Sequence, residues 1–445
     1  MSMVDKAVIL LRPGSGKNIL GLPLLLRAIL AGRQAGVKTF YLIGPGKEAE
    51  PALVESIKND RRILSSPLDL HYLQAEAFSS PGNPAAQELF NSPEGFLVLD
   101  GDLVFDPSLL DEVKFFEFQN QEIIIFKTGP DAATSDSNSN WTGLAIISGS
   151  LLPGLLGRLC SDNDQGSELL AALPLTAAVN HSTLSPGHFL LRVNSRESEK
   201  KAEKVLLSTA RKPQDGFIAR HFNRHVSLFL SQRLIKLRVS PSLLSFLNFL
   251  IGLVGAWLAA LGRGYWTFFL AGLCFELASI FDGCDGEVAR LTYNTSDRGA
   301  FSDVLLDASS YIIFFSGLAL GLYRYKQDSN YLTLMIIFLL SAAWYYYNLA
   351  RYSRSSGIGK KIFLVAKEIE SRPEKEKKLS LVDKIAAKVA FAVRRDFFAT
   401  AVFVLLALGQ APVVIYLICS GSLAESIYFH FYVQKKLVSQ SAEIN

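Results

Sequence analysis

Two segments of the second half of the chain decide its fold and its chemistry. They are Asp282-Gly283-Cys284-Asp285-Gly286-Glu287-Val288-Ala289-Arg290 and Gly299-Ala300-Phe301-Ser302-Asp303-Val304-Leu305-Leu306-Asp307. The first segment closes a long apolar run, 264–281, and the second opens another, 303–323. Charged residues are costly at the ends of such runs, so a group of them points to a function.

Helical spacing places the small and acidic residues of each segment on one shared face. They recur at steps of three or four: Asp282, Asp285 and Ala289 in the first segment, and Gly299, Asp303 and Asp307 in the second. If the two faces meet, four carboxylates converge at the membrane boundary. Carboxylates so close together in a low dielectric cannot all stay ionised without cations between them.

The residue types indicate which ions and ligand such a site would take. Oxygen-only ligands favour Mg²⁺, Mn²⁺ or Ca²⁺, and Mg²⁺ typically also binds substrate phosphate. Gly286, Ala289 and Gly299 leave a recess without large side chains, where a ligand can approach the backbone. The simplest occupant is a metal-bound diphosphate positioned for displacement.

Apolar runs of about 17 to 24 residues, long enough to cross a bilayer, recur through the second half. The six expected spans are 242–261, 264–281, 303–323, 331–350, 397–412 and 412–433. The alternative is a large buried helical core, which so many runs in one half of the chain disfavour. We therefore expect an all-α six-helix transmembrane domain over residues 241–445.

Basic residues predict the orientation of these spans. They precede the first span, lie between the second and third and between the fourth and fifth, and follow the sixth. By the positive-inside rule, both termini and the first half of the chain are cytoplasmic, in a multi-pass protein of the cell membrane. Residues 211–240 mix apolar side chains with Arg and His, and we expect an amphipathic helix lying in the interface.

The first half, residues 1–210, has the pattern of a soluble α/β domain. Apolar strand-like stretches at 7–11, 38–43, 95–99 and 122–126 alternate with helical stretches, including 22–35 and one from about residue 48. This alternation favours a mostly parallel, doubly wound, Rossmann-like sheet. The fold class is thus multidomain, with a soluble α/β domain followed by a helical membrane domain.

Composition excludes several functional classes. Hydrophobic residues make up 49% of the 445, which excludes disorder. The net charge of +4 is mild, so nucleic acid is not an expected partner. The four cysteines are scattered without a CxxC pair, which disfavours a disulfide framework or a zinc site.

The order D-x2-D-G-x2-A-R-x8-G-x3-D-x3-D is complete over residues 282–307 and resembles the signature of the CDP-alcohol phosphotransferases. The resemblance extends over roughly residues 212–435. It implies that an acceptor hydroxyl attacks the β-phosphorus of a CDP-alcohol and that CMP leaves. It also implies two Mg²⁺ (or Mn²⁺) ions and a homodimer.

The same resemblance assigns roles by position. Asp282, Asp285 and Asp303 would hold the metal ions, and Asp307 would be the catalytic base and a further metal ligand. The residues expected at the nucleotide are Asp282, Gly286, Ala289, Arg290 and Gly299.

The first half resembles the sugar-phosphate nucleotidyltransferases. The matching stretches are 7–16, Pro23-Leu24-Leu25, Asp100-Gly101-Asp102 and Thr142-Gly143. Fusion of such a domain to this membrane module is similar to the bifunctional inositol-phosphate cytidylyltransferase/di-inositol-phosphate-phosphate synthases. The usual Pro-Lys pair is missing, however, and Arg192 stands close to where a second acidic ligand is expected. We therefore expect a catalytically degenerate domain, although Lys17 and Asp102 keep the question open.

The sequence leaves three alternative functions. The leading one is a membrane phosphotransferase of phospholipid biosynthesis that uses CDP-diacylglycerol; the alternatives are the bifunctional synthase and a non-catalytic membrane scaffold. The acceptor alcohol is not identified by the sequence. Arg351, Arg354 and Arg394 would clamp a phosphorylated acceptor, and their alternative role is contact with anionic lipid.

Overall fold

The computed structural model describes residues 4–45, 49–66, 68–75, 95–113, 122–127, 142–152, 155–156, 178–183, 185, 188–211, 219–355 and 395–444. The chain divides into two compact units, Met1–Thr209 and Ala210–Asn445. Each unit is described by itself below.

The first unit is built on a seven-stranded sheet with the strand order β10-β8-β9-β6-β1-β4-β5. The strands are β1 (Lys6–Leu10), β4 (Thr39–Gly44), β5 (Asp69–Gln74), β6 (Gly95–Asp100), β8 (Glu122–Lys127), β9 (Leu144–Ser148) and β10 (Ala178–Thr183). Only β9 pairs antiparallel with its neighbours β6 and β8; the other pairs in this sheet are parallel. The expected mostly parallel α/β sheet is confirmed.

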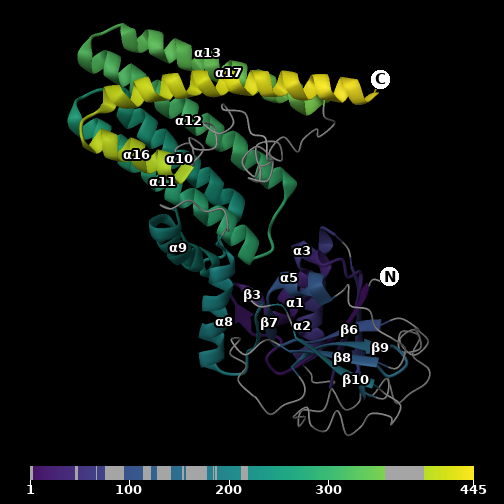
Figure 1. Cartoon of the computed structure of the whole chain (residues 1–445). Coiled ribbons are helices and arrows are strands. Elements are labelled where there is room, and N and C mark those ends of the chain that lie inside the picture. The colour runs from purple at the N-terminus through teal and green to yellow at the C-terminus, as the bar shows by residue number, and fades with distance from the viewer. Residues whose placement is uncertain are drawn as a thin grey trace. The chain divides into compact units, whose positions relative to one another are not determined.

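Short strands and helices complete the first unit (Figure 1). They are β2 (Asn18–Ile19), β3 (Leu22–Pro23), β7 (Leu103–Phe105), β11 (Leu190–Arg192), α1 (Leu24–Gln34), α2 (Ala49–Lys58), α3 (Arg61–Leu64), α5 (Pro107–Val113) and α8 (Arg196–Thr209). Every residue of β6 and β9 is buried. Such continuous apolar strands are typical of a sheet covered on both faces. Asp100, the last residue of β6, is therefore buried.

The second unit is entirely helical where the structure describes it. Its helices are the π-helix η2 (Ala219–Asn223), α9 (Arg224–Lys236), α10 (Pro241–Leu261), α11 (Tyr265–Leu291), α12 (Asp297–Lys326), α13 (Asn330–Ser355), α16 (Arg395–Ala407) and α17 (Ala411–Ile444). Among the described residues, five helices are long and apolar enough to cross a membrane: α10, α11, α12, α13 and α17.

The structure confirms five of the six predicted spans, and the sixth, 397–412, stays a prediction, because its helix begins at Arg395, where the described residues resume. That stretch forms the shorter α16, whose apolar part is Phe397–Ala407. It ends before Gly409, which has a positive φ of 73° and turns the chain into α17.

Small residues bring α10 and α12 into close contact. A Cβ on Gly321 would collide with the carbonyl oxygen of Ala259, and one on Gly317 would lie 2.5 Å from that of Ala256. Close backbone approach through glycine is a common way for membrane helices to associate. Gly317 faces Ala256 and Gly321 faces Ala259, so the residue numbers of the contacting pairs increase together. The helices α10 and α12 therefore run in the same direction.

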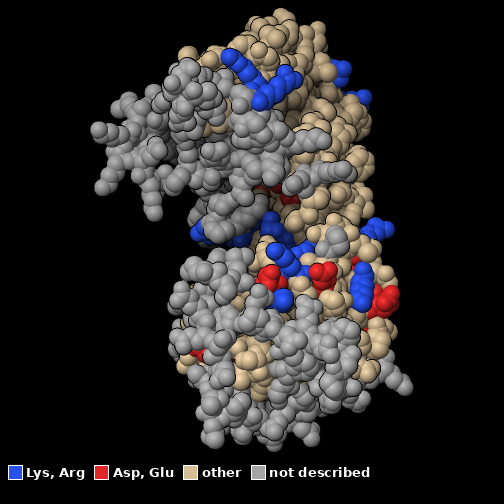
Figure 2. Space-filling view, turned by 90° about the vertical axis from the view of Figure 1, so that its right-hand side faces the viewer, with Lys and Arg blue, Asp and Glu red and all other residues tan. Residues whose placement is uncertain are grey.

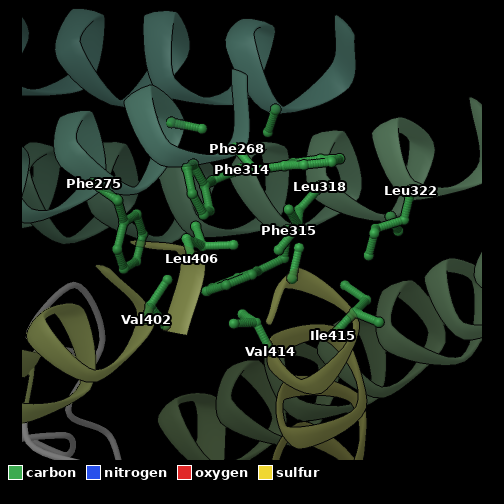
Figure 3. Packing of buried hydrophobic residues seen from close by; sticks show 14 of the residues in the cluster. Phe268, Phe275, Phe314, Phe315, Leu318, Leu322, Val402, Leu406, Val414 and Ile415 are labelled. Carbon is green, nitrogen blue, oxygen red and sulfur yellow. The ribbon is translucent and has the colours of Figure 1, made fainter. Parts of the chain in front are cut away.

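Aromatic side chains fill the rest of the helical core (Figure 3). Phe275 stacks on Phe314 with ring centroids 4.4 Å apart, and Phe315 packs edge-on against both rings. Val402 and Leu406 of α16 and Val414 of α17 close the same cluster. The core therefore joins α11, α12, α16 and α17.

The outer surface of the helical unit is apolar. Large side chains are exposed on it, among them Trp257, Trp266, Leu340 and Phe431, each more than 60% accessible: 62%, 70%, 66% and 67%. In Figure 2 the face of this unit is mostly uncharged, with Lys and Arg gathered above and below a tan band. Both features are those of a protein surrounded by lipid.

Candidate metal and nucleotide site

The two motif segments lie at facing ends of α11 and α12. A short connection, 292–296, joins them, and the Ser296 hydroxyl accepts a hydrogen bond of 3.0 Å from the Gly299 backbone N–H. This cap begins α12 directly after the turn, because it satisfies one of the N–H groups that a helix start leaves without a partner. The helix ends that carry the aspartates are therefore held next to each other.

Three of the four predicted carboxylates come together. Asp282, Asp285 and Asp303 each offer an oxygen, and these oxygens all lie within 4.8 Å of one another. Asp285 is buried, and the other two are half-buried. Asp307 lies one turn further along α12, half-buried, and is not a member of this group. The spacing argument thus placed the two faces correctly.

Ser245 of α10 orients the most buried of these acids. Its hydroxyl donates a hydrogen bond of 2.5 Å to Oδ2 of Asp285, and both residues are buried. A charge-assisted bond of this kind fixes the carboxylate in one rotamer. Ser245 was not expected as a site residue, because it lies forty positions from Asp285 and has no acidic or metal-ligating chemistry of its own.

Glu287 is a second residue that sequence analysis missed. It is fully buried, and three side chains of α9 bind its carboxylate. Arg224 Nη1 and the Ser227 hydroxyl donate to Oε1 at 2.6 and 2.7 Å, and the Ser231 hydroxyl donates to Oε2 at 2.7 Å. This network joins α9 to the end of α11 that carries Asp285.

The network also shows which way α9 faces. Its buried face carries Arg224, Ser227 and Ser231, whereas the apolar side chains of Val226 and Phe229 are 47% and 57% exposed. The buried face thus carries the polar groups that bind Glu287 beside Leu228 and Ile235, while Val226 and Phe229 stay exposed. That arrangement suits a helix lying against lipid.

Arg290 covers the predicted nucleotide recess. The three nearest atoms to a Cβ built on Gly286 all belong to its guanidinium, the closest at 3.1 Å. Its Nη2 donates to the carbonyl oxygen of Ala210 at 2.9 Å. Ala289 lies on the same helix, and Gly299 is in the first turn of α12. A cationic group thus lies over a position that has no side chain.

The structure places only part of the predicted acceptor clamp. Arg351 and Arg354 are exposed in the last turns of α13. Arg394 lies outside the described residues.

The acidic pair of the first unit is neutralised by arginines. Asp100 is fully buried and makes ion pairs with Arg12, at 2.9 Å, and with Arg192. Arg192 also approaches Asp102, with 3.8 Å between Nη1 and Oδ2. Burial raises the pKa of Asp102, and the positive charge of Arg192 partly opposes this. Two guanidinium groups therefore lie where a metal ion would need the carboxylates.

The sequence profile described as CDP-alcohol phosphatidyltransferase matches residues 238–368, which include the whole acidic cluster. This region belongs to that family. The match places the acidic cluster inside a CDP-alcohol phosphatidyltransferase family region of the chain. The expectation of a CDP-alcohol phosphotransferase is confirmed at this level.

Several proteins named "Bifunctional IPC transferase and DIPP synthase" are similar to this chain. The one from Archaeoglobus fulgidus is 34% identical over 152 residues, which cover 34% of this chain and 28% of the relative. The one from Aquifex aeolicus is 35% identical over 167 residues, which cover 37% of each chain. The match with the Rubrobacter xylanophilus protein is 37% identity over 129 residues, 29% of each chain. The chain thus spans about a third of the length of these relatives.

Solved structures are similar to about half of the chain. The inositol-1-phosphate CTP transferase from T. maritima covers 46% of this chain with 97% of its own length, at 15% identity and a TM-score of 0.33. A glucose-1-phosphate thymidylyltransferase from Bacillus anthracis has a TM-score of 0.31 at 15% identity, with 45% of this chain covered.

Proposed function

We propose that the membrane unit moves a substituted phosphate group from a CDP-alcohol to an acceptor hydroxyl and releases CMP. The observation that carries this proposal is the grouping of Asp282, Asp285 and Asp303 within 4.8 Å, inside the family region. Three carboxylates at this distance repel one another, and cations between them would relieve the repulsion. They are also the oxygen ligands that Mg²⁺ and Mn²⁺ prefer.

In this proposal Asp282, Asp285 and Asp303 hold Mg²⁺, with Asp307 as a further ligand. The bound ions supply Lewis-acid stabilisation of the diphosphate and of the leaving CMP. Ser245 keeps Asp285 in the orientation that the site needs. Arg290, above Gly286, binds the donor's phosphates, and Gly286, Ala289 and Gly299 leave room for the nucleotide.

The transfer is a displacement at the β-phosphorus of the donor. The acceptor oxygen forms a new bond to this phosphorus, while the bond from phosphorus to the bridging oxygen breaks and CMP leaves with that oxygen. Asp307 takes the hydroxyl proton, acting as general base. It lies on α12 one turn from the carboxylate group. Arg351, Arg354 and Arg394 would bind a phosphate of the acceptor.

The named relatives favour the bifunctional alternative over CDP-diacylglycerol as donor. We therefore propose a CDP-inositol-type donor for the membrane unit, in place of the lipid donor that the sequence suggested. The cytidylyltransferase half of that alternative is opposed by the ion pairs of Asp100 with Arg12 and Arg192. The donor would then come from another enzyme that forms a CDP-polyol.

The choice of donor predicts the outcome of a direct assay. Purified full-length protein in detergent with Mg²⁺ is offered CDP-inositol or CDP-diacylglycerol, each with inositol-1-phosphate and a small panel of other alcohols. We expect CMP release with CDP-inositol to exceed that with the lipid donor at least tenfold and to stop when EDTA removes the metal. Faster release with CDP-diacylglycerol would return the protein to phospholipid synthesis, and no release with either donor would favour the scaffold.

The arginine-paired acids predict that the first unit does not transfer cytidylyl groups. With CTP, Mg²⁺ and inositol-1-phosphate, the full chain should form no more pyrophosphate than an enzyme-free blank, because Asp100 and Asp102 are held by Arg12 and Arg192. Pyrophosphate formation that disappears in Asp102→Asn would contradict this and establish the bifunctional enzyme. The Asp106→Asn variant, which changes an acid outside this pair, serves as the control.

A further inference from the structure

Asn248 is a buried amide in α10 whose oxygen the described residues do not satisfy. Its side chain is 4% exposed, and its Oδ1 has no hydrogen-bond partner within the part of the chain that the structure describes. Buried side-chain polar atoms are bonded in the large majority of cases, so each exception requires an explanation. A leucine would fill the same space without this cost, which makes a purely structural reason for an amide unsatisfactory.

The neighbours of Asn248 place it at the level of the acidic site. One turn before it, Ser245 binds Asp285 of α11. One turn after it, Gly252 packs so closely on Ser310 of α12 that a Cβ there would collide with the serine hydroxyl. Because α10 and α12 run in the same direction, one turn back from Gly252 and Ser310 reaches Asn248 on one helix and Asp307 on the other.

We propose that Asn248 binds a hydroxyl group of a polyol acceptor, next to the hydroxyl that Asp307 deprotonates. The inference rests on the proposed function, because it needs an acceptor alcohol in this site. An amide offers an acceptor oxygen and a donor N–H₂ without adding charge to a site that already holds four carboxylates. It thus recognises a neighbouring hydroxyl and orients the acceptor, while the proton transfer is left to Asp307. A polyhydroxylated acceptor satisfies the buried oxygen; a simple apolar alcohol would not.

The chain offers a matched control for this residue. Ser316 of α12 also has a buried side-chain oxygen for which the described ranges hold no partner, and it lies more than two turns beyond Asp307. Removing its hydroxyl in Ser316→Ala deletes a similar atom away from the acidic site. Comparison of the two variants separates a polar atom that meets substrate from one that is merely buried.

The test measures KM for each substrate and the thermal midpoint, with full-length protein, Mg²⁺, CDP-inositol and inositol-1-phosphate. In Asn248→Leu we expect KM for inositol-1-phosphate to rise at least tenfold. KM for CDP-inositol and the stabilisation by Mg²⁺ with CMP should stay within twofold, and the thermal midpoint should not fall. Ser316→Ala should leave both KM values within twofold of the wild type.

The other outcomes overturn the proposal in distinguishable ways. An unchanged KM for inositol-1-phosphate in Asn248→Leu shows that the amide does not meet the acceptor. A rise in both KM values together with a lower thermal midpoint shows a structural role. A wild-type protein that releases no CMP from either CDP-alcohol refutes the proposed function and, with it, the role of Asn248. A wild type that is active but inert toward inositol-1-phosphate refutes the polyol assignment alone.

Discussion

Asp307→Asn is expected to lower CMP release by about 10²–10⁴-fold, the contribution usual for a positioned general base. The asparagine has the same shape but cannot take the proton of the acceptor hydroxyl. Because Asp282, Asp285 and Asp303 remain to hold metal, binding of Mg²⁺ with CMP should change little. The measurements are single-turnover CMP release and the rise in thermal midpoint when Mg²⁺ and CMP are added.

An acid near the other end of α12 supplies the control for this variant. Asp328 lies just beyond the other end of α12, where it accepts a hydrogen bond from the Asn330 backbone N–H. Asp328→Asn should keep wild-type turnover. If Asp307→Asn retained more than a tenth of the activity, Asp307 would lose its role as base. If it lost the stabilisation by Mg²⁺ and CMP instead, it would be a metal ligand before anything else.

The acidic site could be anticipated because its information is local. Asp282 and Asp285 share a face by their spacing alone, and so do Asp303 and Asp307. The apolar runs beside them limit how the two helices can lie. The only long-range contact that had to be predicted was the one between two adjacent helices joined by a short turn. The structure brings three of the four acids together.

Residues that act across distant parts of the chain could not be anticipated in this way. Ser245 and Asp285 are forty positions apart, and Arg224 and Glu287 are sixty-three apart. A serine in an apolar helix has no sequence signal that names its partner. The sixth span stays a prediction for a related reason, because apolar composition in 397–412 does not distinguish lipid contact from protein contact. Leu406 and Val402 of this stretch pack in the protein core.

In the first unit, the buried carboxylate of Asp100 pairs with two arginines. Sequence comparison located Asp102 and noted that an arginine, Arg192, stands where an acid is expected. It did not identify Arg12, which belongs to the loop after β1 and pairs with Asp100 at 2.9 Å. Two arginines from different elements on one buried carboxylate strengthen the case against a metal there, since guanidinium and Mg²⁺ compete for the same oxygens.

Arg224→Met is expected to destabilise the helical unit by about 3–5 kcal/mol, because it leaves the buried carboxylate of Glu287 without its cation. At roughly 2–4 °C per kcal/mol for a unit of this size, the thermal midpoint in detergent should fall by about 10 °C. Hydrogen exchange should rise in α9 first, since Ser227 and Ser231 bind the same carboxylate. The loss measures the uncompensated charge more than the strength of the pair.

A second substitution distinguishes these two contributions. Arg224→Met combined with Glu287→Met removes both charges and should recover most of the lost stability, because an apolar pair of similar volume replaces a desolvated ion pair at little cost. Arg233→Met provides the control on the same helix, since Arg233 is exposed and lies over the Phe229 ring at 4.9 Å; it should change stability by less than about 1 kcal/mol. A double variant as unstable as Arg224→Met would mean that the carboxylate itself holds α9 through its serines. In that case Glu287 would be the residue that keeps α9 on the end of α11 that carries Asp285, and the ion pair would only neutralise it.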